Sequence, residues 1–203
     1  HNGSKMWVFS PDFNQVAKYA DEYIPLNAGQ DGAWWMAVNH VLLKEFHHER
    51  PVAHFLDYAR RFTDAPLLVE LTERDGHYEA GQLLRANRLQ AYADVENGDW
   101  KFLMWDEAHN APKMPMGSVG FRWGSEKGKW NLLLRDGLDG KDIHPTLTFL
   151  EKHDSVVSVR FDDFSEARDL LREVPVRFVG TADGRHVAVA TVYDLLMAQY
   201  GVS

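Results

Sequence analysis

The beginning of the chain alternates between strand-like and helix-like patterns, and this alternation limits the folds that the chain can form. Met6 to Phe9 is a short apolar run of the kind found in buried strands, and Ser10-Pro11-Asp12 then predicts a turn. A short helix is predicted from Phe13 to Ala20 and a second strand from Tyr23 to Leu26. A long helix from Asp31 to Phe46 completes the order strand, helix, strand, helix, which predicts an α/β arrangement.

The long helix carries apolar side chains on nearly every side, which predicts that it is buried between other elements. We expect Trp34 and Trp35 to lie in the core. Arg50-Pro51 interrupts the pattern, and an amphipathic helix is predicted from Val52 to Phe62. Residues 1–65 are therefore expected to form one Rossmann-like strand–helix lobe that contributes a nucleotide site.

The pattern changes after Pro66. Residues 66–174 contain glycines, prolines, charged residues and short apolar runs with weak helical periodicity, which predicts a β-rich or irregular insertion. A strand is expected from Leu67 to Leu71 at its beginning, and a helix from Phe164 to Arg172 near its end.

Residues 175–203 predict a terminal hairpin followed by a helix. The two strands are expected from Pro175 to Val179 and from His186 to Ala190, with a glycine-containing turn between them. Thr191 is expected to cap a helix that ends before Gly201.

The composition excludes several classes of function. The formal net charge of −8 argues against broad binding to nucleic acid, although it permits one small nucleotide held by backbone N–H groups. The chain has no cysteine, so these residues cannot ligate an iron–sulfur cluster through thiolates or form a disulfide. No apolar run approaches the length of a membrane span, so no direct span is predicted.

The loop of Ser10, Pro11, Asp12, Phe13 and Asn14 is the first candidate binding site. It lies between the end of a predicted strand and the start of a predicted helix, which is where open α/β sheets bind ligands. The alternative is that Ser10 and Asp12 only cap the helix.

The triplet Gly29, Gln30 and Asp31 opens the long helix and is the second candidate site. The Asp31 carboxylate could accept two parallel hydrogen bonds from the N1–H and N2–H groups of guanine. The alternative is that Asp31 is a helix N-cap. Neither loop contains a G-x-G-x-x-G or Walker motif, so spacing alone does not decide between these interpretations.

The histidines and one aromatic, basic stretch offer weaker candidates. His40 and His47 are two helical turns apart, roughly 10 Å by helix rise, which is too far to share one ion. The stretch from Gly120 to Asn131 combines Trp123 and Trp130 with three basic residues. It could dock an anionic cofactor or a partner, or it could be a surface loop held by its tryptophans.

Several longer stretches resemble one known family. SPDFNQVAKYADEYIP, GQDGAWWMAVNHVLLKEF and DYARRFTDAPLLVEL resemble the catalytic alpha subunit of membrane-bound respiratory nitrate reductase. GSVGFRWGSEKGKWNL and TVYDLLMAQYGV resemble later parts of the same subunit in the same order. The FRWG and EKGKWNL motifs are specific to this group within the wider molybdopterin oxidoreductase superfamily. The resemblance covers nearly the whole chain.

The resemblance implies a function for a larger protein. The family's alpha subunit carries molybdenum bis(molybdopterin guanine dinucleotide) and one iron–sulfur cluster, and it reduces nitrate to nitrite. Its electrons come from an iron–sulfur beta subunit and a haem-bearing membrane gamma subunit, which implies membrane association through these partners, on the cytoplasmic face. By similarity, Ser10 to Asn14 and Gly29 to Asp31 contact a guanosine end of the cofactor.

The resemblance also implies what these residues do not provide. In the family, the aspartate that ligates molybdenum and the ligands of the iron–sulfur cluster lie upstream of this stretch. We therefore assign no metal ligand and no catalytic residue, and we expect the chain to be an interior segment that is inactive alone. Three alternatives stay open: a nitrite oxidoreductase of the same family, a stand-alone nucleotide-binding module, and a scaffold that docks a partner through residues 100–130.

Overall fold

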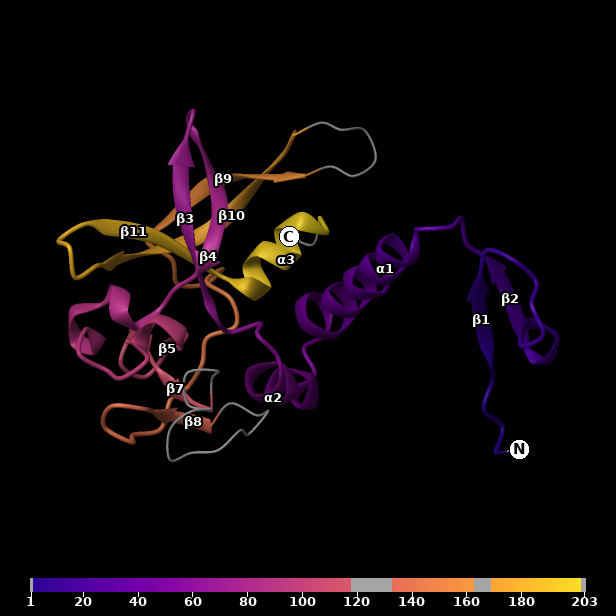
Figure 1. Cartoon of the computed structure of the whole chain (residues 1–203), viewed down its shortest axis with the longest axis horizontal. Helices are drawn as coiled ribbons and strands as arrows, with labels where there is room; N and C mark the ends of the chain where they lie inside the picture. The colour runs from indigo at the N-terminus through magenta and orange to yellow at the C-terminus, as the bar shows by residue number, and fades with distance from the viewer. Residues whose placement is uncertain (1, 118–132, 163–168, 202–203) are drawn as a thin grey trace.

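The computed structural model describes residues 2–117, 133–162 and 169–201. A small strand pair at the N-terminal end is separated by helices from a larger β-rich part that contains the C-terminal half of the chain (Figure 1). The described residues are thus mixed α/β, as expected, with more strand than helix. The Rossmann-like expectation receives no confirmation, because the N-terminal sheet has only two strands.

The two N-terminal strands are parallel. β1 (Trp7–Ser10) pairs with β2 (Glu22–Pro25), close to the positions predicted. The predicted helix between them is reduced to one 3-10 turn, η1 (Ala17–Tyr19). The expectation of a buried first strand is wrong, since the Trp7 side chain is 56% exposed.

Three consecutive helical elements follow the strand pair. α1 (Asp31–Leu43) continues into a π-helical turn, η2 (Lys44–Glu49), and then into α2 (Ala53–Phe62). The prediction that α1 is buried on all sides is wrong, because Leu43 is its only buried residue. Trp35 is 59% exposed, so the core prediction fails for it, whereas the Trp34 ring lies 4.2 Å from the ring of Phe9. The other residues of α1 are exposed or only partly buried.

Five strands form a closed barrel in the order β10-β11-β3-β4-β9. All neighbouring strands are antiparallel except β4 and β9, which are parallel. The barrel strands are β3 (Leu68–Arg74), β4 (His77–Leu83), β9 (Ser155–Asp162), β10 (Asp169–Gly180) and β11 (His186–Thr191). The strands predicted at Leu67 to Leu71, Pro175 to Val179 and His186 to Ala190 are confirmed.

The predicted helix from Phe164 to Arg172 is wrong where the structure describes it. Residues 169–172 belong to β10, which pairs with β9 over eight positions from Asp169↔Asp162 to Val176↔Ser155. Hydrogen bonding to a neighbouring strand overrides the local helix propensity of this stretch. β10 also runs across the predicted boundary between residues 174 and 175.

Alternate residues of the barrel strands pack into different hydrophobic clusters. Leu68 and Val189 belong to one cluster, whereas Val69 and Ala190 belong to another that also contains Leu195 of α3 (Val192–Gln199). This alternation follows from the two-residue period of a strand, and burial on both faces supplies most of the folding energy.

The C-terminal helix forms as predicted. The Thr191 hydroxyl accepts a hydrogen bond from the backbone N–H of Asp194 at 2.9 Å and caps α3. Gly201 follows the helix with φ +70°, a left-handed conformation that favours glycine and ends the helix.

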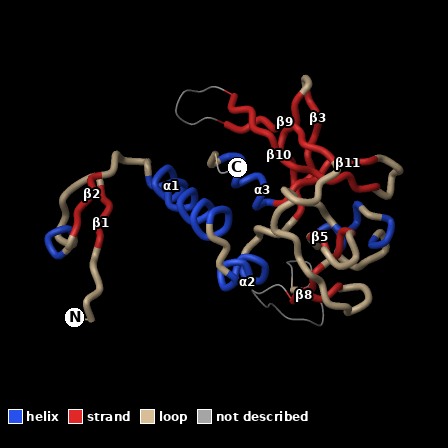
Figure 2. Tube along the Cα trace, turned by 180° about the vertical axis from the view of Figure 1, so that it is seen from behind, coloured by secondary structure: helices blue, strands red, loops and turns tan. Residues whose placement is uncertain are grey.

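Short hairpins and turns cover one end of the barrel (Figure 2). They are the hairpin of β5 (Met104–Asp106) and β6 (Ala111–Lys113), the pair β7 (Pro115–Met116) and β8 (Leu133–Asp136), and the 3-10 turns η3 (Ala86–Arg88), η4 (Gln90–Tyr92) and η5 (Gly98–Trp100). In the part of the chain that the structure describes, no helix has the length and apolar character needed to cross a bilayer.

Candidate functional site

The two predicted binding loops leave the strand pair at the same edge. Ser10 pairs with Pro25 in the parallel register, and the backbone N–H of Leu26 donates to the carbonyl of Ser10 at 3.3 Å. The loop after β1 and the segment that leads from β2 to α1 therefore begin side by side (Figure 1). This is the carboxyl edge of the parallel pair, where α/β sheets generally bind ligands.

Asn14 organises the first loop. Its Oδ1 accepts hydrogen bonds from the backbone N–H groups of Val16 at 2.9 Å and Ala17 at 3.1 Å, which fixes the start of η1. Its Nδ2 donates to Ser10 Oγ at 3.4 Å, and Ser10 Oγ donates to Asp12 Oδ1 at 3.4 Å. The alternative that Ser10 and Asp12 cap this turn is therefore wrong, because Asn14 supplies the capping oxygen.

Phe13 provides an exposed aromatic surface beside this loop. Its side chain is 65% exposed, and its ring meets the Tyr23 ring edge-on with centroids 5.1 Å apart. The Tyr23 hydroxyl donates to the Ser10 carbonyl at 3.0 Å, so the pair is fixed to the end of β1. A planar ligand such as a nucleobase could lie against such a surface.

The second loop presents Asp31 at the first turn of α1. Gln30 occupies the N-cap position without a side-chain cap hydrogen bond, so the alternative that Asp31 is the N-cap is wrong. Gly29 has φ +83°, a conformation that favours glycine, and its turn brings Gln30 N–H to the Asn27 carbonyl at 3.1 Å. Pro11 of the first loop is exposed between Ser10 and Asp12.

This arrangement can bind a ligand that carries both an anionic group and hydrogen-bond-donating groups. The first N–H groups of a helix have no partner within the helix and give its N-terminus a positive potential. The exposed Asp31 carboxylate makes no hydrogen bond or ion pair with any described residue, so both of its oxygens are free to accept. Exposed backbone donors and a carboxylate together suit a ligand that has both phosphate and N–H groups.

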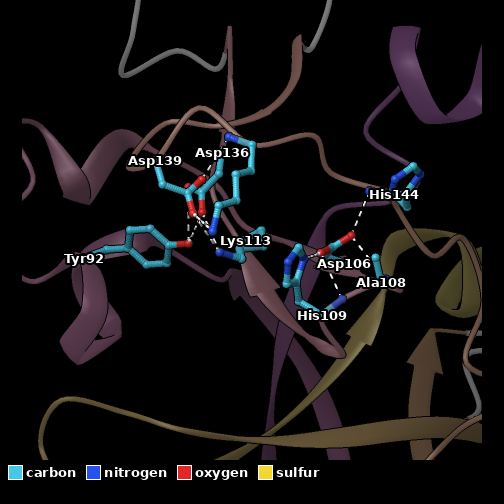
Figure 3. A network of polar contacts seen from close by, with 9 residues as sticks. Tyr92, Asp106, Ala108, His109, Lys113, Asp136, Asp139 and His144 are labelled. Carbon is cyan, nitrogen blue, oxygen red and sulfur yellow. Dashed lines mark hydrogen bonds and ion pairs between the residues drawn. The ribbon is translucent and has the colours of Figure 1, made fainter.

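A second polar region lies in the β-rich part and consists of contacts around a buried carboxylate. Asp136 is 1% exposed, and its carboxylate contacts Lys113 Nζ at 2.8 Å and the Tyr92 hydroxyl at 3.2 Å (Figure 3). Burial, followed by the charge of Asp136, raises the pKa of the Tyr92 hydroxyl. The hydrogen bond to Asp136 is the main cause that raises the pKa of Lys113.

The neighbouring carboxylate of Asp106 is fully buried and closes the β5–β6 turn (Figure 3). It accepts from the backbone N–H groups of His144 at 2.8 Å and His109 at 3.2 Å, and from the His109 ring. Burial acts to raise the pKa of Asp106, but these hydrogen bonds outweigh burial and lower it. The sequence did not distinguish Asp106 or Asp136, because both stand in stretches that are typical of surface turns.

The histidines are dispersed. His40 Nδ1 is 2.7 Å from the Tyr200 carbonyl, and the His47 ring packs against Tyr193 with centroids 4.5 Å apart. His153 Nδ1 is 3.1 Å from the Phe149 carbonyl. Among the described residues, no group of three or more potential ligands could hold a metal ion. The stretch from Gly120 to Asn131 lies outside the described residues.

Comparisons with known proteins show which proteins the chain is similar to. No protein-family model matches the chain. The respiratory nitrate reductase 1 alpha chain of Escherichia coli K12 is 40% identical over 214 residues, which cover all of this chain and 17% of that protein. The nitrate reductase alpha chain of Bacillus subtilis 168 is 35% identical over 205 residues, covering all of this chain and 16% of that protein.

The chain is homologous to one segment of nitrate reductase alpha chains. The perchlorate reductase alpha subunit of Dechloromonas aromatica is also similar, with 31% identity over 98% of this chain and 18% of that protein. The chain thus spans about one sixth of the length of the curated relatives that it matches. In this chain, the two loops at the carboxyl edge of β1 and β2 form the candidate site.

Proposed function

We propose that the chain is part of a molybdenum-dependent respiratory nitrate reductase that reduces nitrate to nitrite. The loops Ser10 to Asn14 and Gly29 to Asp31 would contact the guanosine end of molybdenum bis(molybdopterin guanine dinucleotide). The observation that carries this proposal is the placement of an exposed, unpaired Asp31 carboxylate beside the end of β1, in a homologue of nitrate reductase alpha chains.

The residues fit the guanosine part of the cofactor. The Asp31 carboxylate would accept hydrogen bonds from the guanine N1–H and N2–H groups, and Phe13 would lie against the nucleoside. Ser10 and Asp12 would bind the remaining polar groups of the nucleoside. When bound, the cofactor would supply oxygen-atom transfer at molybdenum, while this chain supplies binding and orientation.

The other components of the enzyme follow from the proposed family function. We propose an iron–sulfur beta subunit and a haem-bearing membrane gamma subunit as partners, and an iron–sulfur cluster held elsewhere in the full protein. These partners would attach the protein to the cytoplasmic face of a membrane.

The proposal is tested by Asp31→Asn in the full-length protein. Asparagine keeps the shape but places an N–H donor against a guanine donor, and charge-assisted hydrogen bonds are worth roughly 1.5–3 kcal/mol. We expect molybdenum and guanine content per protein to fall by about tenfold or more. Glu45→Gln, an exposed change near the other end of α1, should leave both contents unchanged. An unchanged guanine content in Asp31→Asn would refute the assigned contact.

A further inference from the structure

A cavity lies between the η2–α2 segment and the β-rich part, away from the two loops. It has a volume of about 370 Å³, and we call it the His47 cavity after a residue on its helical side. Pro51, Leu56 and Arg60 line the same side, and Trp105 and Arg177 line the opposite side. Leu43 and Ala59 pack against Leu147 and Tyr193 nearby, so a hydrophobic core holds the two sides together.

Polar atoms without partners gather at this cavity. Of the five buried side-chain polar atoms that lack a hydrogen-bond partner among the described residues, three belong to its lining: His47 Nδ1, Arg60 Nε and Trp105 Nε1. A fourth is the hydroxyl of Tyr193, whose ring packs on His47. Burying a polar group without a partner is costly, so such atoms in one place indicate a missing partner.

The unpartnered atoms require hydrogen-bond acceptors. The indole N–H of Trp105 and the Nε–H of Arg60 can only donate. Trp105 is 6% exposed, so its N–H is removed from bulk solvent. A ligand that satisfies both groups must therefore bring oxygen atoms that accept.

The charges around the cavity favour an anion. Burial and then the positive charges of His48 and Arg60 lower the pKa of His47, so its imidazole is neutral at pH 7 and can donate through one nitrogen. The Arg177 guanidinium lies 4.7 Å from the centre of the Trp105 ring. Glu107 also lines the cavity, but it is paired with Lys152 at 4.0 Å and its side chain is 57% exposed.

Arg177 is held in place by other contacts. Its Nε donates to the Lys152 carbonyl at 3.0 Å, and its Nη1 lies 3.7 Å from the Asp154 carboxylate. It therefore contributes positive potential, whereas Arg60 offers a donor that no described residue uses. Glu151 is the remaining acidic residue in the lining.

We propose that the His47 cavity binds a small organic anion, with its oxygens accepting hydrogen bonds from Arg60 and Trp105. An organic anion fits better than an inorganic one for two reasons. The volume lies in the range of small-molecule sites, and Pro51 and Leu56 provide an apolar wall. This site does not depend on the function proposed above.

Benzoate is a suitable probe, because it joins a carboxylate to a flat apolar body, and benzamide is its neutral counterpart. Binding of each to the full-length protein is measured by isothermal titration calorimetry. We expect benzoate to bind at millimolar concentration and benzamide to bind at least about tenfold more weakly. Arg60→Gln should weaken benzoate binding by about tenfold or more. Arg61→Gln, on the same helix but paired with Asp57, should leave it unchanged.

Trp105→Phe provides the second variant. It removes the indole N–H but keeps an aromatic ring beside Arg177, and we expect about fivefold weaker benzoate binding. A thermal melt of each variant identifies loss of folding, and Trp105→Phe decides the question if Arg60→Gln does not fold. Absence of benzoate binding would overturn the proposal, because ordered water or another part of the protein would then satisfy these atoms. Equal binding of benzoate and benzamide, or unchanged binding to the folded variants, would also overturn it.

Discussion

Ser10 of β1 and Pro25 of β2 are partners in a parallel register, so both strands end at the same level. This relationship brings two loops that are separated in sequence to one edge of the sheet. Asn14 then fixes the first loop, and the left-handed conformation of Gly29 sets the direction of α1 and of Asp31. The candidate site therefore depends on local backbone geometry as much as on its exposed side chains.

Asn14 is expected to control the order of the first loop. Asn14→Ala removes the acceptor for the backbone N–H groups of Val16 and Ala17, a change worth about 1 kcal/mol for a capping side chain. Hydrogen exchange of these two amides should accelerate by about fivefold. Asn14→Asp keeps an acceptor for these two N–H groups and should retain their protection from hydrogen exchange. Equal exchange in the native protein and Asn14→Ala would show that the loop is held by other contacts.

The buried ion pair of Lys113 and Asp136 is expected to stabilise the hairpins. Lys113→Met would leave the Asp136 carboxylate buried without its cation, which typically costs about 3 kcal/mol or more of unfolding free energy. Lys141→Met is the matched control, because Lys141 is 69% exposed and 3.5 Å from Asp139, and exposed pairs contribute about 0–1 kcal/mol. Urea unfolding measures both changes. If the two variants lose similar amounts of unfolding free energy, burial of the Lys113–Asp136 pair does not increase its contribution to stability.

Asp194 is expected to make stability depend on pH. Burial raises the pKa of its carboxyl to about 6, although hydrogen bonds from Thr148, the Phe149 N–H and Thr191 act to lower it. Below about pH 4 the carboxyl is protonated in both the folded and unfolded states. As the pH rises from about 4 to about 6, the unfolded state ionises first, so the free energy of unfolding falls.

Comparison with Asp194→Asn isolates this effect, because asparagine does not titrate. Between pH 4 and pH 6, the free energy of unfolding of the native protein should fall by up to about 3 kcal/mol relative to that of the variant. Above pH 6 it should change little. Thermal melts across this range measure the difference. A constant difference between the two proteins, or one that grows in favour of the native protein, would rule out a raised pKa at Asp194.

The sequence predicted those elements whose pattern is local. The parallel strands, α2, the terminal hairpin and the Thr191 cap all formed close to the expected positions, because strand alternation and capping chemistry act over a few residues. Residues 169–172 were misassigned as helix because their own composition does not show the hydrogen bonds that they form with the preceding strand, β9. The burial of α1 was also wrong, since its apolar composition cannot show which elements are present to cover it.

The candidate site was partly predictable for the same reason. Both loops were identified by their positions between a strand end and a helix start. The sequence did not show which residue would cap the helical turn that follows each loop. Asn14 took the capping role expected of Ser10 and Asp12, and Gln30 took the N-cap position expected of Asp31. Buried Asp136 could not be recognised, because its partner Tyr92 lies 44 residues away in sequence.

Thr191 is expected to stabilise the junction between the barrel and α3. Its buried hydroxyl accepts from the Asp194 N–H at 2.9 Å and donates to the Leu147 carbonyl at 2.7 Å. Thr191→Ala removes a cap and leaves a buried carbonyl unpaired, so unfolding free energy should fall by about 2 kcal/mol or more. Thr191→Ser keeps the hydroxyl and should lose about 1 kcal/mol, for the missing methyl group. Chemical denaturation that ranks the two variants equally would argue against the hydrogen-bonding role.

Asp31 and the loop after β1 are proposed to contact a guanosine end of the molybdenum cofactor. An experimental structure of the cofactor-loaded full-length protein tests this proposal most directly. We expect the Asp31 carboxylate oxygens to lie about 2.7–3.0 Å from guanine N1 and N2. Phe13 and Ser10 should lie beside the same nucleoside. A guanosine bound elsewhere, with Asp31 facing solvent or another protein segment, would contradict the account.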